Sequence, residues 1–158
     1  MRDFFNRVRK HLILLFATFF YTGYSPVAPG TVGTIGAMFL LLVLSVFSLE
    51  VYFLFLVGFI IFSIWVSGRA SYLLGTEDPR QVVIDEVCGY MVTMSFLPFS
   101  LTNMVIGFFL FRFFDVVKPP PLRRLESLKG GIGIVADDIC AGVYANLILQ
   151  IITRVKGG

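Results

Sequence analysis

Apolar residues run in long stretches along this chain, and short polar segments separate them. The pattern predicts helices over residues 35–47, 51–67, 81–98, 104–117 and 134–152. Short turns at residues 48–50 and 100–103 divide neighbouring stretches, and the prolines after Lys118 end the fourth, because consecutive prolines cannot continue a helix. We therefore expect an all-α fold, a polytopic transmembrane helical bundle of about five spans.

The N-terminal part differs from the rest because its apolar stretch is short. Residues 1–11 are polar and basic, and residues 12–21 are apolar. At about 1.5 Å per residue, this stretch cannot cross a hydrocarbon core of about 30 Å. We expect a short interfacial or half-spanning helix, followed by a helix-breaking loop at residues 25–34. Residues 23–26 show no small-residue cleavage site, so we expect no cleavable signal peptide.

The composition agrees with a membrane protein. Of the 158 residues, 57% are apolar and 15% are charged, and the mean hydropathy is +0.87, whereas a soluble domain carries about 25% charged residues. Lipid must therefore solvate much of the surface. No repeat divides the sequence, and we expect one membrane-embedded domain over residues 1–158. Cys88 and Cys140 lie in apolar stretches, which indicates small buried side chains rather than a disulfide.

The order of the predicted spans brings three polar segments to one face of the bilayer. Residues 25–34 precede the first span, residues 68–86 follow the second, and residues 118–133 follow the fourth. Each pair of spans returns the chain to the same side, so this holds for either orientation. With a non-spanning N-terminal helix, only Arg154 and Lys156 of the basic residues outside the spans lie on the other face. The positive-inside rule then makes the polar face cytoplasmic.

Five acidic residues lie at or just inside the cytoplasmic end of a predicted span. They are Asp85, Glu86, Asp115, Asp137 and Asp138. Ionisable groups at membrane depth are costly and usually face a partner or a cavity. Carboxylates that converge from three helix ends would repel one another, so a divalent cation or several basic partners would have to compensate them. Hard oxygen ligands of this kind favour Mg²⁺, Mn²⁺ or Ca²⁺.

Basic residues near the acidic ones indicate a phosphate ligand. They are Arg112, Lys118, Arg123 and Arg124, and cations beside a carboxylate–metal site suit a phosphate group. The glycine-rich segments at residues 25–34 and 130–133 could add backbone N–H donors, because the start of a helix favours an anion. In a bilayer, this combination indicates a lipid phosphate.

Each of these segments also has a purely structural interpretation. Asp85 and Glu86 suit the start of any helix, and Arg112, Asp115 and Lys118 fit an ion-pair ladder on one helix. The two glycine-rich segments fit a tight turn and a flexible hinge. We interpret the remaining polar residues as an ordinary solvated loop and an interfacial histidine; they are Arg69, Glu77, Asp78, Arg80 and His11. The functional interpretation is preferred because all the motifs fall on one face.

Four ordered motifs cover nearly the whole chain. They are Ser25-Pro-x-x-Pro29-Gly30-Thr31-x-Gly33, Asp85-Glu86-x-x-Gly89, Phe111-Arg112-x-x-Asp115-x-x-Lys118-Pro119-x-Pro121, and Gly130-Gly131-x-Gly133-x-x-x-Asp137-Asp138-x-x-Ala141-Gly142. In this order, the sequence resembles the phosphatidylglycerophosphatase A family. The resemblance implies a Mg²⁺-dependent phosphatase of the bacterial inner membrane, which converts phosphatidylglycerophosphate to phosphatidylglycerol. Its partners would be a phospholipid substrate and the membrane, with no nucleic acid.

Candidate roles follow from the motifs and from the phosphatase classes that the sequence does not fit. It has no Cys-x5-Arg loop, no Asp-x-Asp-x-Thr motif and a single histidine, which leaves metal-assisted hydrolysis. The catalytic candidates are Asp85, Glu86, Asp115, Asp137 and Asp138. All except Asp115 are candidate metal ligands, and which carboxylate acts as general base stays open. The candidate phosphate clamp is Arg112, Lys118, Arg123 and Arg124, and the candidate headgroup contacts are Ser25, Gly30 and Thr31.

Two other functions compete with this interpretation. A phospholipid headgroup transferase also uses aspartates at the membrane edge, but its usual Asp-x-x-Asp-Gly-x-x-Ala-Arg motif is absent from the sequence. A transporter or channel would need charges through the depth of the membrane. Here the charges lie almost entirely at one end, and the opposite turns, such as residues 100–103, are nearly uncharged.

Overall fold

The computed structural model of the protein describes residues 1–125 and 127–157. The side chains of Arg2 and Lys156, which the charge distribution above includes, lie outside the described residues. The elements are α1 (Arg2–Ala17), η1 (Thr22–Tyr24), α2 (Pro29–Leu44), α3 (Leu49–Leu74), α4 (Ile84–Met94), α5 (Leu101–Val117), α6 (Leu122–Leu125) and α7 (Gly131–Gly157). This part of the chain contains no strand, so the predicted all-α fold is confirmed.

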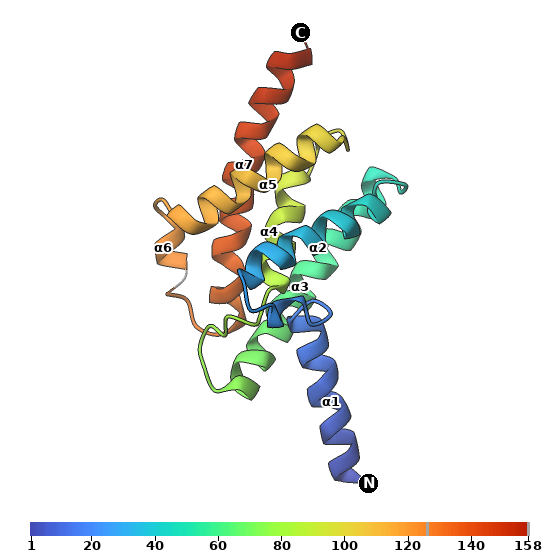
Figure 1. Ribbon diagram of the computed structural model, residues 1–158, viewed down its shortest axis with the longest axis vertical. Coiled ribbons are helices and arrows are strands. Elements are labelled where there is room, and N and C mark those ends of the chain that lie inside the picture. The colour runs from blue at the N-terminus through green and yellow to red at the C-terminus, as the bar shows by residue number, and fades with distance from the viewer. Residues whose placement is uncertain (126, 158) are drawn as a thin grey trace.

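Helix α4 forms the centre of the fold (Figure 1). It packs most extensively on α7 and also contacts α2, α3 and α5. Nine of its eleven residues are buried. The Tyr90 hydroxyl donates a hydrogen bond to the carbonyl of Met104 in α5 at 2.7 Å, and the Tyr52 hydroxyl of α3 donates to the carbonyl of Met91 at 2.6 Å. These buried bonds tie the neighbouring helices to the middle of α4.

Helices α4 and α7 cross at a pair of glycines. A Cβ atom at Gly142 of α7 would collide with the backbone carbonyl oxygen of Gly89 in α4. A Cβ at Gly89 would lie 2.5 Å from the carbonyl oxygen of Asp138 and 2.5 Å from the ring of Phe111. Only residues without side chains allow such a close approach. The crossing therefore holds the part of α7 that carries Asp138 against the middle of α4.

Among the described residues, two helices are long and apolar enough to cross a membrane by length and composition, namely α3 (Leu49–Leu74) and the Gly131–Val155 part of α7. Helix α2 has 16 residues, α5 has 17 and α4 has 11. At about 1.5 Å per residue, α4 is roughly half as long as a hydrocarbon core is thick. Residues 81–98 thus do not form one continuous helix, because the backbone is extended at Ser95 and Phe96 has a positive φ of 61°. The number of spans stays a prediction.

The two glycine-rich segments were predicted to be a loop and a hinge, and both predictions are partly wrong. Helix α2 already begins at Pro29, because the fixed φ of proline suits the first helical position. Gly130 has a positive φ of 70°, but α7 begins at the next residue. A Cβ at Gly131 would collide with the carbonyl oxygen of Ile64 in α3, so this glycine serves helix packing and not flexibility.

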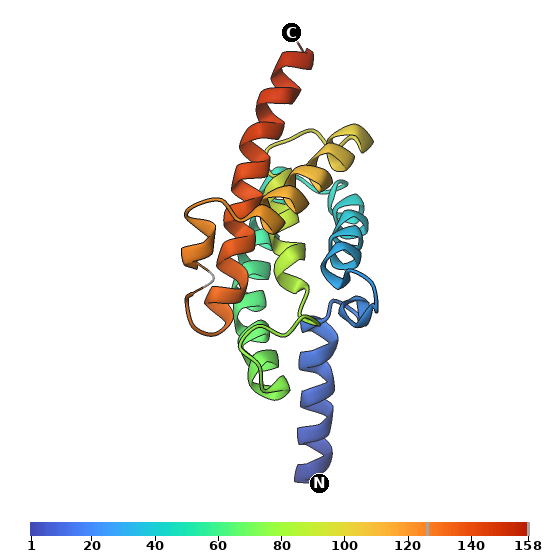
Figure 2. The same ribbon diagram turned by 60° about the vertical axis from the view of Figure 1, so that its left-hand side comes forward.

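The N-terminal helix also differs from the prediction in its bounds. It was predicted over residues 12–21, but α1 runs from Arg2 to Ala17 and includes the basic segment, whose Arg and Lys residues are good helix formers. Residues 19–21 have positive φ and end it. Ile13 and Ala17 pack with Val66 and Ala70 of α3, while the N-terminal turns extend away from the other helices (Figures 1 and 2).

Candidate active site

Three carboxylates meet where the first turn of α4 lies beside α7. Asp85 and Glu86 belong to the first turn of α4, and Asp138 lies on α7 beside the glycine crossing. One oxygen from each of the three lies within 4.8 Å of the others. Asp85 and Asp138 are only 7% and 4% exposed. The fold therefore brings together three of the four predicted metal ligands.

The negative charges of this cluster favour the binding of a cation. Like charges at such distances repel strongly, and burial removes the water that would screen them. Asp85 Oδ1 and Glu86 Oε2 are buried and have no hydrogen-bond partner among the described residues. Buried polar atoms are rarely left unpaired without a functional reason. A hard divalent cation takes several carboxylate oxygens, so the donor set fits such an ion.

Local backbone contacts fix the position of this end of α4. The N–H group of Val83, just before the helix, donates to the carbonyl of Ala17 at the end of α1 at 3.0 Å. Val83 is fully buried, and a Cβ at Gly33 of α2 would lie 2.8 Å from its Cβ. The first turn of a helix also favours the negative charges of Asp85 and Glu86. The end of α1 and the start of α2 thus position the two carboxylates.

Helix α5 carries Arg112 and is followed directly by Lys118, and each of these two cations is paired with a carboxylate. Arg112 Nη1 lies 2.7 Å from Asp115 Oδ2 and 3.9 Å from Glu86 Oε1. This nitrogen is buried and forms no hydrogen bond within the described part of the chain, so it can still donate one to a ligand. Lys118 Nζ donates to Asp137 Oδ2 of α7 at 2.8 Å. The charged residues of α5 therefore reach both α4 and α7, which a ladder along one helix would not do.

The start of α2 lies against the same ion pair. A Cβ at Gly30 would collide with Glu86 Oε1 and would lie 3.1 Å from Arg112 Nη1. Thr31 follows in the first turn and is half-buried. The Ser25 hydroxyl instead donates to the carbonyl of Val27 in its own loop at 2.9 Å. Of the three predicted headgroup contacts, the structure thus brings Gly30 to the charged cluster.

Asp137 and the two arginines of α6 lie outside the three-carboxylate cluster. Consecutive residues on a helix point in different directions, and Asp137 faces Lys118 and a cavity instead. Arg123 and Arg124 are exposed on α6. They lie on the segment that leads to Ser127 at the edge of that cavity.

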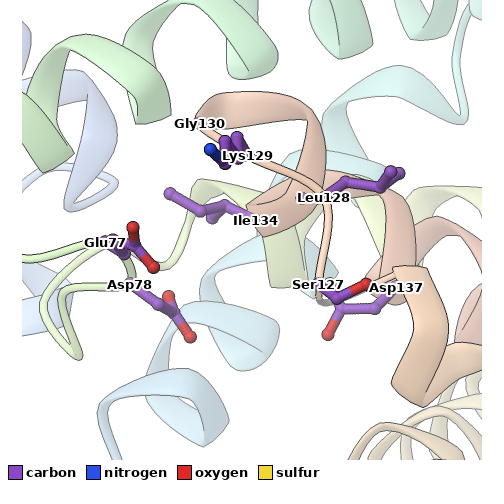
Figure 3. Close-up of a pocket in the computed structure, with 9 residues that line it drawn as sticks. Glu77, Asp78, Ser127, Leu128, Lys129, Gly130, Ile134 and Asp137 are labelled. Atoms are coloured by element: carbon purple, nitrogen blue, oxygen red, sulfur yellow. The ribbon is translucent and has the colours of Figure 1, made fainter.

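A cavity of about 300 Å³ adjoins the site and is partly acidic. Figure 3 shows Glu77 and Asp78 on one side and Ser127 and Asp137 on the other. Asp78 is close enough to Asp85 for the two carboxylates to interact electrostatically. We interpreted Glu77 and Asp78 as an ordinary solvated loop, although the segment that contains them also carries Asp85. Because Glu77 and Asp78 share a polar segment with Asp85, the sequence already indicated that they lie near the site.

Comparisons with known proteins identify a family for this chain. The family described as phosphatidylglycerophosphatase A matches residues 15–153. A provisionally named phosphatidylinositol-3-phosphatase of Bacteroides thetaiotaomicron is 35% identical over 63% of this chain and 64% of its own length. The phosphatidylglycerophosphatase A of Haemophilus influenzae is 31% identical over 65% of this chain and 64% of its own. That of Escherichia coli is 33% identical over 87% of this chain and 81% of its own. The chain thus spans less than two thirds of the first two relatives, and no solved structure matches it.

Proposed function

Because the chain belongs to the phosphatidylglycerophosphatase A family, we propose that it is a Mg²⁺-dependent phosphatase that hydrolyses phosphatidylglycerophosphate. Water attacks the terminal phosphorus, the ester bond to the headgroup breaks, and phosphatidylglycerol and inorganic phosphate are released. The observation that carries this proposal is the meeting of Asp85, Glu86 and Asp138, with the guanidinium of Arg112 beside them.

The metal ligands would be the three clustered carboxylates. Their mutual distances and the unpaired oxygens of Asp85 and Glu86 fit a hard divalent cation such as Mg²⁺. A bound Mg²⁺ would polarise the phosphoryl group and neutralise charge that develops on it.

The side chains around the cluster would hold the phosphate and the water. Arg112 and Lys118 would bind phosphate oxygens from α5, because both cations lie within ion-pair distance of the acidic residues. We assign the general base to Asp137, because it is next to Asp138 in the chain and lines the cavity that adjoins the site. Asp115 would orient Arg112 from one helical turn away.

We place the protein in the bacterial inner membrane as a multi-pass protein, with this site facing the cytoplasm. Only 22% of the apolar window of α3 is buried. Large apolar side chains on α2, α3, α5 and α7 are exposed; examples are Phe39, Leu54, Ile61, Phe109, Leu147 and Ile151. An exposed apolar surface of this extent needs lipid or a partner to cover it. The basic residues on the side of the site support the cytoplasmic orientation.

The direct test is phosphate release by the purified protein in detergent. We expect turnover of phosphatidylglycerophosphate with Mg²⁺ and none in excess chelator. Asp138→Asn should lower kcat/KM by more than about 100-fold, because even an outer-shell partner of a metal ligand is worth about 10–100-fold. Glu50→Gln is the control, since Glu50 is an exposed acid at the start of α3. Full activity in chelator, or in a folded Asp138→Asn protein, would refute the metal role.

The Bacteroides relative favours a second substrate of the same class. Its name refers to removal of the 3-phosphate of phosphatidylinositol 3-phosphate, which is also a phosphomonoester on a lipid headgroup. The proposed site would use the same carboxylates and the same cations on either lipid. A comparison of kcat/KM for the two lipids decides between them, and we expect phosphatidylglycerophosphate to be preferred because two relatives and the family carry that name.

A further inference from the structure

An apolar groove of about 330 Å³ runs between α2 and the start of α5, apart from the acidic cavity. Its walls include Ile35, Met38, Phe39 and Leu42 of α2 and Leu101 and Met104 of α5. Two serines also line it, but both hydroxyls are engaged locally. The Ser45 hydroxyl donates to the carbonyl of Leu42 at 2.7 Å, and the Ser100 hydroxyl accepts from the N–H of Asn103 at 3.2 Å. The groove thus offers an apolar ligand no competing polar partner.

The groove is open to the surroundings. Phe39 is 66% exposed and Leu101 is 74% exposed. Helix α2 packs mainly on α4 and touches α5 only slightly, and it lies at the edge of the bundle in Figure 2. A ligand could therefore enter from the side, between the two helices.

Both walls of the groove lead to the charged cluster. On α2, Ile35 lies five residues after Gly30, which is about 7.5 Å along the helix, and Gly30 touches Glu86 and Arg112. On α5, Met104 lies eight residues before Arg112, which is about 12 Å. A molecule in the groove would have one end beside the guanidinium and the other end near the opposite turns.

The length of the groove matches one leaflet of a bilayer. Its α2 wall runs from Ile35 to Ser45, which is about 15 Å at 1.5 Å per residue. Half of a hydrocarbon core of about 30 Å is also about 15 Å. An acyl chain of about this length would fill the groove.

We propose that this groove binds one acyl chain of the phospholipid substrate, which enters sideways between α2 and α5 and places its phosphate at Arg112. The proposal rests on the lipid phosphatase function proposed above. It assigns substrate selection to two places: the charged cluster binds the phosphate, and the groove selects molecules with a long chain.

The test compares substrates that differ only in their chains. Leu42→Trp fills the groove from a position that is 52% exposed, so the fold should tolerate it. We expect its kcat/KM for dioleoyl phosphatidylglycerophosphate to fall about tenfold, as for a mismatch in an apolar pocket, while the water-soluble dihexanoyl form is cleaved as by the wild type. Ile61→Trp on α3, which is 64% exposed and does not line the groove, is the matched control. Equal losses on both substrates, no loss, or the same loss in the control would overturn the proposal.

A second measurement separates the groove from the proposed reaction. A phosphatidylglycerophosphate with a photoreactive group on one acyl chain should label α2 and α5 around Ile35 and Leu101. Excess unlabelled phosphatidylglycerophosphate should displace it, and phosphatidylcholine should not. If the protein releases no phosphate but this labelling persists, the groove stands and the phosphatase function fails. If phosphate is released but the labelling spreads evenly over α3, the function stands and the groove fails.

Discussion

The two ends of the helical bundle differ in whether their polar side chains have hydrogen-bond partners. At the turns between α2 and α3 and between α4 and α5, uncharged polar side chains bond to nearby backbone: Ser45 donates to the carbonyl of Leu42 at 2.7 Å, and Asn103 donates to the carbonyl of Pro98 at 3.0 Å. At the other end, Asp85 and Glu86 keep buried oxygens without a partner among the described residues. Unpaired buried charge lowers stability, so its restriction to one end indicates where the protein requires a ligand.

Among changes that test this difference, we expect the largest loss of activity from one that moves apart the helices that bring the carboxylates together. Gly142→Ala places a Cβ against the carbonyl oxygen of Gly89, and backbone cannot move aside as a flexible side chain can. We expect a loss of about 1–3 kcal/mol in stability from overpacking. Because a displacement of about 1 Å can cost 100-fold in rate, we also expect kcat/KM to fall about 100-fold. Thermal unfolding in detergent and phosphate release measure the two effects.

A second glycine supplies the control for that experiment. Gly58 of α3 has nothing within 4 Å of an added Cβ, so Gly58→Ala should keep activity and should not destabilise the helix. A Gly142→Ala protein with wild-type stability and turnover would show that the close crossing does not hold Asp138 in place.

A smaller change tests the geometry of the cation beside the cluster. Arg112→Lys keeps the positive charge but loses the planar fork that can bind two phosphate oxygens at once. We expect kcat/KM to fall roughly 10-fold to 100-fold with little loss of stability. Arg154→Lys, at an exposed position near the far end of α7, should leave kcat/KM unchanged. Equal values for the two variants would mean that Arg112 acts only as a charge.

The order of polar segments along the sequence predicted much of this site, because helix parity needs only the sequence. Asp85, Glu86 and Asp138 were predicted to share one face, and the structure brings them within 4.8 Å of one another. Helix parity does not predict the direction of a side chain. Asp137 faces Lys118, whereas its neighbour Asp138 belongs to the carboxylate cluster. Parity also cannot show how closely helices approach. The glycines at 89, 131 and 142 serve packing, which depends on neighbours distant in sequence.

The finest test concerns Asp78, which was interpreted as part of a solvated loop. This exposed carboxylate interacts electrostatically with Asp85 and lines the cavity next to the cluster. Its negative charge should attract a divalent cation from a distance, so Asp78→Asn should raise the Mg²⁺ concentration for half-maximal activity about two- to fivefold. The effect should shrink at high salt, because exposed charges are screened. Glu50→Gln removes an exposed charge at the start of α3 and should leave the Mg²⁺ dependence unchanged. If Asp78→Asn behaves like that control, the acidic region ends at Asp85 and the solvated-loop interpretation is correct.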